Sequence, residues 1–273
     1  MIESLLISFL LLLGFFIGAF DAVVSGGNLF TLSLLNLLGL GPLSSIATMQ
    51  LVTLFQTGAA FIAFARKKLI NWKQTLPFCA TAVAASLIGA NITIAIPQKI
   101  LALISGALML SLLFFIPRIE GETEIFFPVK FIRRLLDPIL HTRLQLTHNW
   151  RQVILLHLAI FLIALYGGFF GAGIGIMLLI VVLMVGDASI PVTIANTKLI
   201  DVCLSFSASL VFFNQAGLVD WRYFVPLAIG SSVGSFLGAN WIKKIDVWIL
   251  RLGLYLVVVA SAIKLLITGI INY

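Results

Sequence analysis

The chain has 273 residues, of which 61% are hydrophobic and only 10% are charged. A soluble globular domain carries roughly 25% charged residues, so the composition excludes that class and indicates an integral membrane protein. The net charge of +7 does not indicate a nucleic-acid partner, because the basic residues cluster between hydrophobic segments, as in the positive cytoplasmic loops of membrane proteins. Long uncharged runs favour helices over a β-barrel, whose strands alternate over about 10 residues.

The first stretch, MIESLLISFLLLLGFF, lacks the basic region and the small-residue cleavage site of a signal peptide, so we expect it to be a retained helix. Residues 4–40 would make about 55 Å of helix, more than the roughly 30 Å of a bilayer core. This stretch is therefore predicted to cross the membrane twice or to form a hairpin of shorter helices. The interruption lies in AFDAVVSGGN, residues 19–28.

Turn residues and charges divide the whole chain into about 8–10 hydrophobic segments. These segments lie near 4–20, 29–40, 45–65, 74–96, 98–117, 153–170, 175–186, 192–213, 223–242 and 248–269. The predicted organisation is a first transmembrane repeat over residues 1–117, a linker over 118–152 and a second transmembrane repeat over 153–273.

The linker begins with three glutamates and continues with FFPVKFIRRLLDPIL. Its apolar residues share one helical face while the basic residues point toward lipid headgroups, which predicts a short helix on the cytoplasmic surface of the membrane. His141 and His148 have no partners at metal-ligand spacing, and we expect them to be solvated.

The two halves of the chain contain matching motifs, 148 or 149 residues apart. The pairs are SLIGAN (86–91) with SFLGAN (235–240), INW (70–72) with VDW (219–221), and SIATMQL (45–51) with TIANTKL (193–199). Such internal duplication is typical of transporters. A structural membrane protein that arose by duplication is the alternative.

Each half makes an odd number of crossings in both interpretations of residues 4–40, so the second half is predicted to be inverted relative to the first. An inverted arrangement also places the main basic clusters on one side of the membrane, in agreement with the positive-inside rule. These clusters are the linker, Arg66, Lys67, Lys68, Lys73, Lys243, Lys244 and Arg251.

Three ionisable residues lie deep in predicted spans: Asp21, Lys198 and Asp201. Burying such a group costs several kcal/mol unless it has a partner or reaches water. Lys198 and Asp201 are three residues apart and share a helical face, so they could form a self-neutralising structural pair. The functional interpretation is that Lys198 faces a hydrated cavity as the positive element of an anion site.

Glycine-rich breaks, SGGN (25–28) and GGFFGAGIG (167–175), occupy equivalent places in the two halves. A half-helix that begins after a break would direct its free N–H groups and the positive end of its dipole toward the membrane midplane. Two such ends predict a pocket for an anion. The alternative is a kink or tight helix packing.

The chain shows no Ser/His/Asp set, no HExxH motif and no phosphate loop, so we expect neither an enzyme nor a metal or other cofactor. Cys79 and Cys203 lie in apolar helical stretches and are predicted to be small packing residues, without a disulfide.

The chain resembles the sulfite exporter TauE/SafE family of membrane transporters. The resemblance rests on GFFIGAFDAVVSGGNLFTL, SIATMQL, GGFFGAGIG, TIANTKL, GLVDW and SFLGAN. It implies a multi-pass carrier of small sulfur-containing anions, such as sulfite and sulfonates, in the bacterial plasma membrane. The family commonly reads Ala-Thr-Asn-Lys-Leu where this chain has residues 47–51, Ala-Thr-Met-Gln-Leu. With Lys198 as the remaining lysine, a less charged or differently shaped substrate is expected.

Together these features predict an all-helical secondary transporter with two inverted repeats, each opening on a broken or re-entrant helix, and an anion site near the midplane. The residues expected to bind substrate are Lys198, Asn196, Thr197, Thr48, Gln50, Gly26, Gly27, Asn28, Gly171, Gly173 and Gly175. Asp21 and Asp201 are expected to couple protons or to orient Lys198. The expected partners are a small anion and membrane lipid, with a homodimer as an open alternative. The competing function is a channel or a scaffold subunit whose polar groups only hold helices together.

Overall fold

The structure, a computed structural model, describes residues 2–113, 150–185, 190–241 and 247–271, and this part of the chain is helical without strands. Its helices are α1 (Ile2–Val24), α2 (Gly27–Leu37), α3 (Pro42–Arg66), α4 (Trp72–Ala95), α5 (Gln98–Leu113), α7 (Trp150–Phe169), α8 (Ile174–Val185), α9 (Ile190–Phe213), α10 (Trp221–Trp241) and α11 (Val247–Ile271). The predicted surface helix of the linker, with His141 and His148, lies outside the described residues.

Four of the described helices are long and apolar enough to cross a membrane. Their apolar stretches are Glu3–Ala22, Pro42–Arg66, Trp72–Ala95 and Pro191–Phe213. Each predicted hydrophobic segment overlaps one of the observed helices. The prediction of an all-helical membrane protein is confirmed.

The first apolar stretch is interrupted within the predicted motif. α1 ends at Val24, Ser25 has a left-handed φ of 59°, and α2 begins at Gly27. The rings of Phe20 and Phe30 lie 5.6 Å apart across the break. With 11 residues, α2 is about 16 Å long and too short to cross a bilayer core of about 30 Å. The stretch is therefore a hairpin whose first arm, α1, is long enough to cross a membrane and whose second arm is not, a form between the two that were predicted.

A similar break opens the second half of the chain. α7 ends at Phe169, and α8 begins at Ile174 and has 12 residues. Between them, Gly171 and Gly173 both have a φ of 77°, a conformation that side chains other than glycine rarely adopt. The hydroxyl of Tyr166 donates to the carbonyl oxygen of Ala172 at 2.9 Å and holds this turn.

Helices α1, α3 and α10, here called the first bundle, pack side by side and run in the same direction. The contacts that show this, from the beginnings of the helices to their ends, are Glu3 with Arg222, Thr48 with Asp220, Ala19 with Gly238, and Lys67 with Ala239. The bundle therefore combines two helices of the first sequence half with one of the second.

Helices α4, α7 and α9, the second bundle, are arranged in a corresponding way. The contacts that show their common direction are Asn71 with Asn196, Phe78 with His157, Ser86 with Leu204, and Thr93 with Phe169. Short connections join α3 to α4 and α9 to α10, with Phe61 packed on Trp72 and Phe213 on Trp221. The two bundles therefore run in opposite directions.

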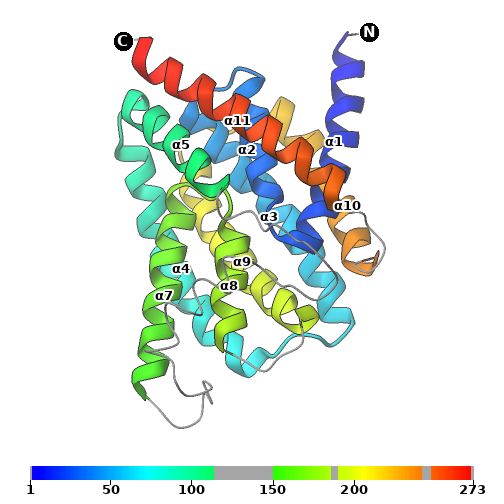
Figure 1. Cartoon of the computed structure of the whole chain (residues 1–273), viewed down its shortest axis with the longest axis vertical. Helices are drawn as coiled ribbons and strands as arrows, with labels where there is room; N and C mark the ends of the chain where they lie inside the picture. Colours follow the sequence, from blue (N-terminus) through cyan, green and yellow to red (C-terminus); the bar gives the residue numbers. More distant parts are fainter. Residues whose placement is uncertain (1, 114–149, 186–189, 242–246, 272–273) are drawn as a thin grey trace.

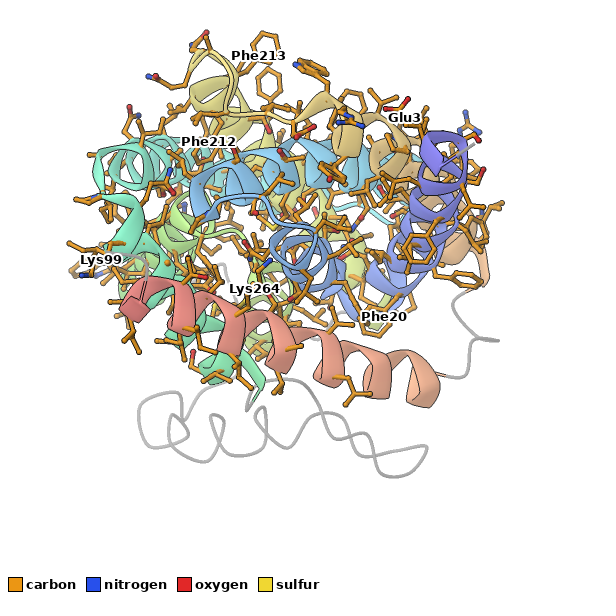
Figure 2. All side chains as sticks on the ribbon, turned by 90° about the horizontal axis from the view of Figure 1, so that it is seen from above. Glu3, Phe20, Lys99, Phe212, Phe213 and Lys264 are labelled. Carbon is orange, nitrogen blue, oxygen red and sulfur yellow. The ribbon has the colours of Figure 1, made fainter. Side chains whose placement is uncertain are left out.

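The interface between the bundles lies where α3 packs against α9. Figure 1 shows α1 and α10 on one side of the molecule and α4 and α7 on the other. Figure 2 shows α11 lying along one edge, where it covers α5 and α2. The ammonium of Lys264 on α11 donates to the carbonyl oxygen of Asn36 at 2.6 Å, which holds the end of α2.

Candidate functional site

A buried ion pair joins the two bundles. Nζ of Lys198, on α9, lies 2.6 Å from Oδ2 of Asp21, on α1, and the two side chains are 0% and 3% exposed. The pair between Arg222 and Glu3 at the surface is 70% and 81% exposed. Removing one member of a buried pair leaves a charge without compensation and costs about 3–5 kcal/mol, so the Lys198–Asp21 contact is energetically important.

The second carboxylate oxygen of Asp21 is also bound. Oδ1 accepts a hydrogen bond of 3.0 Å from the backbone N–H of Gly27, the first residue of α2. A helix amino terminus attracts anions, because its N–H groups have no partners within the helix and the dipole is positive there. The carboxylate of Asp21 thus occupies an anion position formed by an ammonium group and a helix amino terminus.

Asp201 lies one turn from Lys198 on α9 and is 1% exposed. Its Oδ1 accepts a long hydrogen bond, 3.5 Å, from the hydroxyl of Ser205. Lys198 pairs with Asp21 and not with Asp201, so the self-contained pair on one helix is not formed. Two carboxyl groups and one ammonium group are buried together.

The two chain breaks meet in the interior. The amide of Asn28 donates to the carbonyl oxygen of Gly171 at 2.7 Å and accepts from the N–H of Gly173 at 3.0 Å. A Cβ on Gly175 would lie 2.3 Å from the carbonyl oxygen of Ser25, so the backbones are in contact. In this closed arrangement the N–H of Gly27 donates to the side chain of Asp21, and the N–H of Gly173 donates to the side chain of Asn28.

Gln50 makes the contact that corresponds to the one made by Lys198. The two residues occupy the same place in the paired motifs SIATMQL and TIANTKL. Nε2 of Gln50, on α3, donates to the carbonyl oxygen of Gly167, on α7, at 2.6 Å. Each of the two residues therefore reaches from its own bundle into the other one.

Three other predicted ligands are engaged elsewhere. The hydroxyl of Thr48 accepts from the N–H of Asp220 at 3.0 Å, and Oδ1 of Asn196 accepts from the N–H of Asn71 at 2.8 Å. These bonds hold the beginnings of α10 and α4. The hydroxyl of Thr197 donates to the carbonyl oxygen of Thr193 in its own helix at 2.9 Å. The structure thus places these side chains within the bundles.

Sequence reasoning missed Gln56, which lies beside the ion pair. Its side chain is 0% exposed, and within the described part of the chain neither amide atom has a hydrogen-bond partner. Nε2 lies 3.1 Å from the place that a Cβ on Gly27 would take. Buried polar groups are usually paired, so these atoms are available to a polar ligand. The signal in the sequence was a polar row at three-residue spacing along α3: Gln50, Thr53 and Gln56.

The side chains and backbone groups around Asp21 are mostly hydrogen-bond donors. Lys198 and Gly27 contribute an ammonium and a backbone N–H to the two carboxylate oxygens of Asp21, and the amide of Gln56 lies next to Gly27. Across the residues with described positions, no group of three His, Cys, Asp or Glu side chains is placed to bind a metal.

Comparisons with known proteins show the class of protein to which this chain is similar. A family model described as Sulfite exporter TauE/SafE matches residues 10–265. A protein of Sinorhizobium sp. named "Probable membrane transporter protein ORF9" is 24% identical over 96% of this chain and 92% of its own length. A "Probable membrane transporter protein" of Haemophilus influenzae is 27% identical over 86% of this chain and 84% of its own length. No solved structure matches the chain at a significant level.

Proposed function

Because the chain belongs to the sulfite exporter TauE/SafE family of membrane transporters, we propose that it moves a small sulfur-containing anion across the membrane as a secondary transporter. The observation that carries this proposal is the buried ammonium of Lys198, held by an anion of the chain itself at the amino end of α2. An incoming oxyanion finds two donors in one place, the ammonium of Lys198 and the backbone N–H of Gly27.

The opposite directions of matched helices support an inverted repeat. α1 and α7, α3 and α9, and α4 and α10 occupy corresponding places in the two halves, and each pair runs in opposite directions through the molecule. Transporters with this symmetry work by rocking one bundle against the other around a site at their interface. The contacts of Lys198 and Gln50 lie at that interface.

The substrate proposed is a sulfonate or sulfite, with preference for a single negative charge. Gln50 stands where a second lysine is common in the family, and a neutral amide compensates less charge than an ammonium group. Both relatives are bacterial proteins, which supports a place in the bacterial plasma membrane. The protein then acts on its substrate by transport, without chemical conversion.

The test is flux of radiolabelled methanesulfonate and sulfite into proteoliposomes that contain the purified protein. Lys198→Gln should lower the initial rate about 10–100-fold, because a charge-assisted hydrogen bond of roughly 1.5–3 kcal/mol is lost. Lys73→Gln removes an exposed lysine near the start of α4 and serves as the matched control. Equal rates for Lys198→Gln and the wild type would show that the site lies elsewhere.

The competing function is a channel or a scaffold subunit. A channel would conduct the anions without saturation, and a scaffold would carry no flux. Saturation of the initial rate with increasing methanesulfonate, together with competition by sulfite, distinguishes a carrier from both.

A further inference from the structure

We propose that the carboxylate of Asp21 is a resident anion that the substrate displaces from Lys198 and Gly27, and that Asp21 takes up one proton with each anion bound. This inference rests on the proposed transport function and adds to it the coupling ion and the residue that carries it. It follows from the geometry around Asp21, from the charge that is buried there and from the unused donor on Gln56.

The carboxylate of Asp21 occupies the donors that an oxyanion needs. Its oxygens are bound at 2.6 Å by Nζ of Lys198 and at 3.0 Å by the N–H of Gly27. An anion cannot bind the same ammonium and the same helix terminus while the carboxylate remains there. Substrate binding therefore requires Asp21 to release both donors.

Gln56 adds an unused donor next to the helix terminus that binds the carboxylate of Asp21. Its amide is completely buried next to Gly27, and no residue in the described ranges accepts a hydrogen bond from it. A carboxylate has two oxygens and uses Lys198 and Gly27. A sulfonate or sulfite has three oxygens, and the third can accept from Nε2 of Gln56.

The balance of charge requires a proton. With both carboxylates ionised, Lys198, Asp21 and Asp201 sum to one negative charge in a buried site. An added anion would raise this to two negative charges, and buried charge without compensation is strongly unfavourable. A proton on Asp21 restores the original charge and removes the attraction that keeps Asp21 on Lys198.

The other charged groups on the packed helices have contacts of their own, and Lys67 after α3 donates to the carbonyl oxygen of Ala239. α2 carries none, α3 carries only Arg66, and α10 carries Arg222 and Tyr223. Arg66 lies over the ring of Phe236, and Arg222 is paired with Glu3 at the beginning of α1. On α9, Lys198 bonds to Asp21 and the buried Asp201 lies one turn from Lys198, so the choice of proton acceptor is between Asp21 and Asp201.

Asp21 is the acceptor that controls the site, because it alone bonds to both donors. The proton enters from the aqueous side from which the anion comes, binds a carboxylate oxygen of Asp21 and leaves on the side to which the anion goes. No covalent bond other than this O–H bond forms or breaks. A monovalent anion therefore moves together with one proton, and the transport step carries no net charge.

The experiment is isothermal titration of the full-length purified protein with methanesulfonate, which stays ionised across the working pH range. Titration in two buffers with different ionisation enthalpies gives the number of protons taken up for each anion bound. The wild type should take up about one proton for each anion bound, and its affinity should fall as the pH rises, because binding is linked to proton uptake. Asp21→Asn should bind methanesulfonate more tightly, without proton uptake and independently of pH.

Asp201→Asn is the matched variant, because it removes the neighbouring carboxylate and leaves Asp21 in place. It should retain proton uptake. Proton uptake that persists in Asp21→Asn, that is lost in Asp201→Asn alone, or that is absent from the wild type would overturn the proposal. If Asp21→Asn does not fold, the infrared carboxyl band that appears in Asp201→Asn on addition of methanesulfonate decides the same question, and its absence would also overturn the proposal.

Failure of the transport function gives a different result. If methanesulfonate stabilises Asp21→Asn against thermal unfolding but the wild type carries no flux, Asp21 is still the resident anion and the proposed transport is wrong. If methanesulfonate stabilises neither protein, Asp21 does not occupy an anion site and the inference fails.

Discussion

Asn28 shows how a single side chain can hold together two segments that are far apart in the sequence. Its amide bonds to the carbonyl oxygen of Gly171 and to the N–H of Gly173, and it is 2% exposed. Both backbone groups belong to the turn between α7 and α8, where they have no hydrogen-bond partner from a helix backbone. Asn28 therefore stabilises both breaks, a role beyond the substrate binding expected from the sequence.

Replacing Asn28 by Ala should lower the free energy of unfolding by about 2–4 kcal/mol, because two buried backbone groups lose their partners. Asn91→Ala is the control, since Asn91 is exposed and its amide donates to the carbonyl oxygen of Leu87 in its own helix. We expect this control to change stability by less than about 0.5 kcal/mol. Thermal unfolding in detergent measures both, and equal midpoints would contradict the role of Asn28.

At the scale of the element, close packing of α1 on α10 fixes the position of Asp21. Gly230 and Gly234 of α10 lie against the carbonyl oxygens of Leu11 and Phe15 on α1. Small residues at spacings of four allow helix backbones to approach in this way. Because Asp21 lies near the end of the same helix, the backbone contact determines how far its carboxylate reaches toward α9.

Gly234→Ala should destabilise the protein by about 1–3 kcal/mol, because the new Cβ would lie 1.9 Å from the carbonyl oxygen of Phe15 and must push the helices apart. Gly58→Ala is the matched control within α3, where no described atom lies within 4 Å of the added Cβ. The helix propensity of Ala predicts a neutral or slightly stabilising effect there. A Gly234→Ala protein as stable as Gly58→Ala would refute the close contact.

At the scale of the whole molecule, each three-helix bundle mixes the two sequence halves. The bundles meet through α3 and α9, and the contacts of Lys198 and Gln50 cross that interface. Within the second bundle, the thiol of Cys79 on α4 lies against the thiol of Cys203 on α9, and both cysteines are free. This pair tests whether the bundle moves as one body.

Oxidative cross-linking of Cys79 to Cys203 should leave methanesulfonate flux within about twofold of the reduced protein, because rocking of rigid bundles does not change distances inside a bundle. Mass spectrometry establishes that the cross-link has formed, and Cys203→Ser controls for other effects of the oxidant. A large loss of flux that only the cross-linked protein shows would mean that α4 and α9 move relative to each other.

The features predicted well from the sequence are those that depend on local chemistry. Apolar runs predicted the helices, and the glycine-rich motifs predicted the two breaks. At the second break, backbone without a Cβ tolerates the left-handed conformations of Gly171 and Gly173, whereas at the first break the left-handed residue is Ser25. The burial of Asp21 and Lys198 was also predicted, since both lie within long apolar segments. Gln56 was missed because its polar row with Gln50 and Thr53 on α3 does not reveal which neighbouring helix it faces.

The sequence by itself determined that this is an all-helical membrane protein of the TauE/SafE family, with two interrupted helices and buried charge. Only the tertiary structure decided that Lys198 pairs with Asp21 and not with Asp201. The reason is physical. Helix formation and membrane burial depend on residues within a few turns of each other, whereas the partner of a buried charge depends on helix packing that brings together residues 177 apart in the chain.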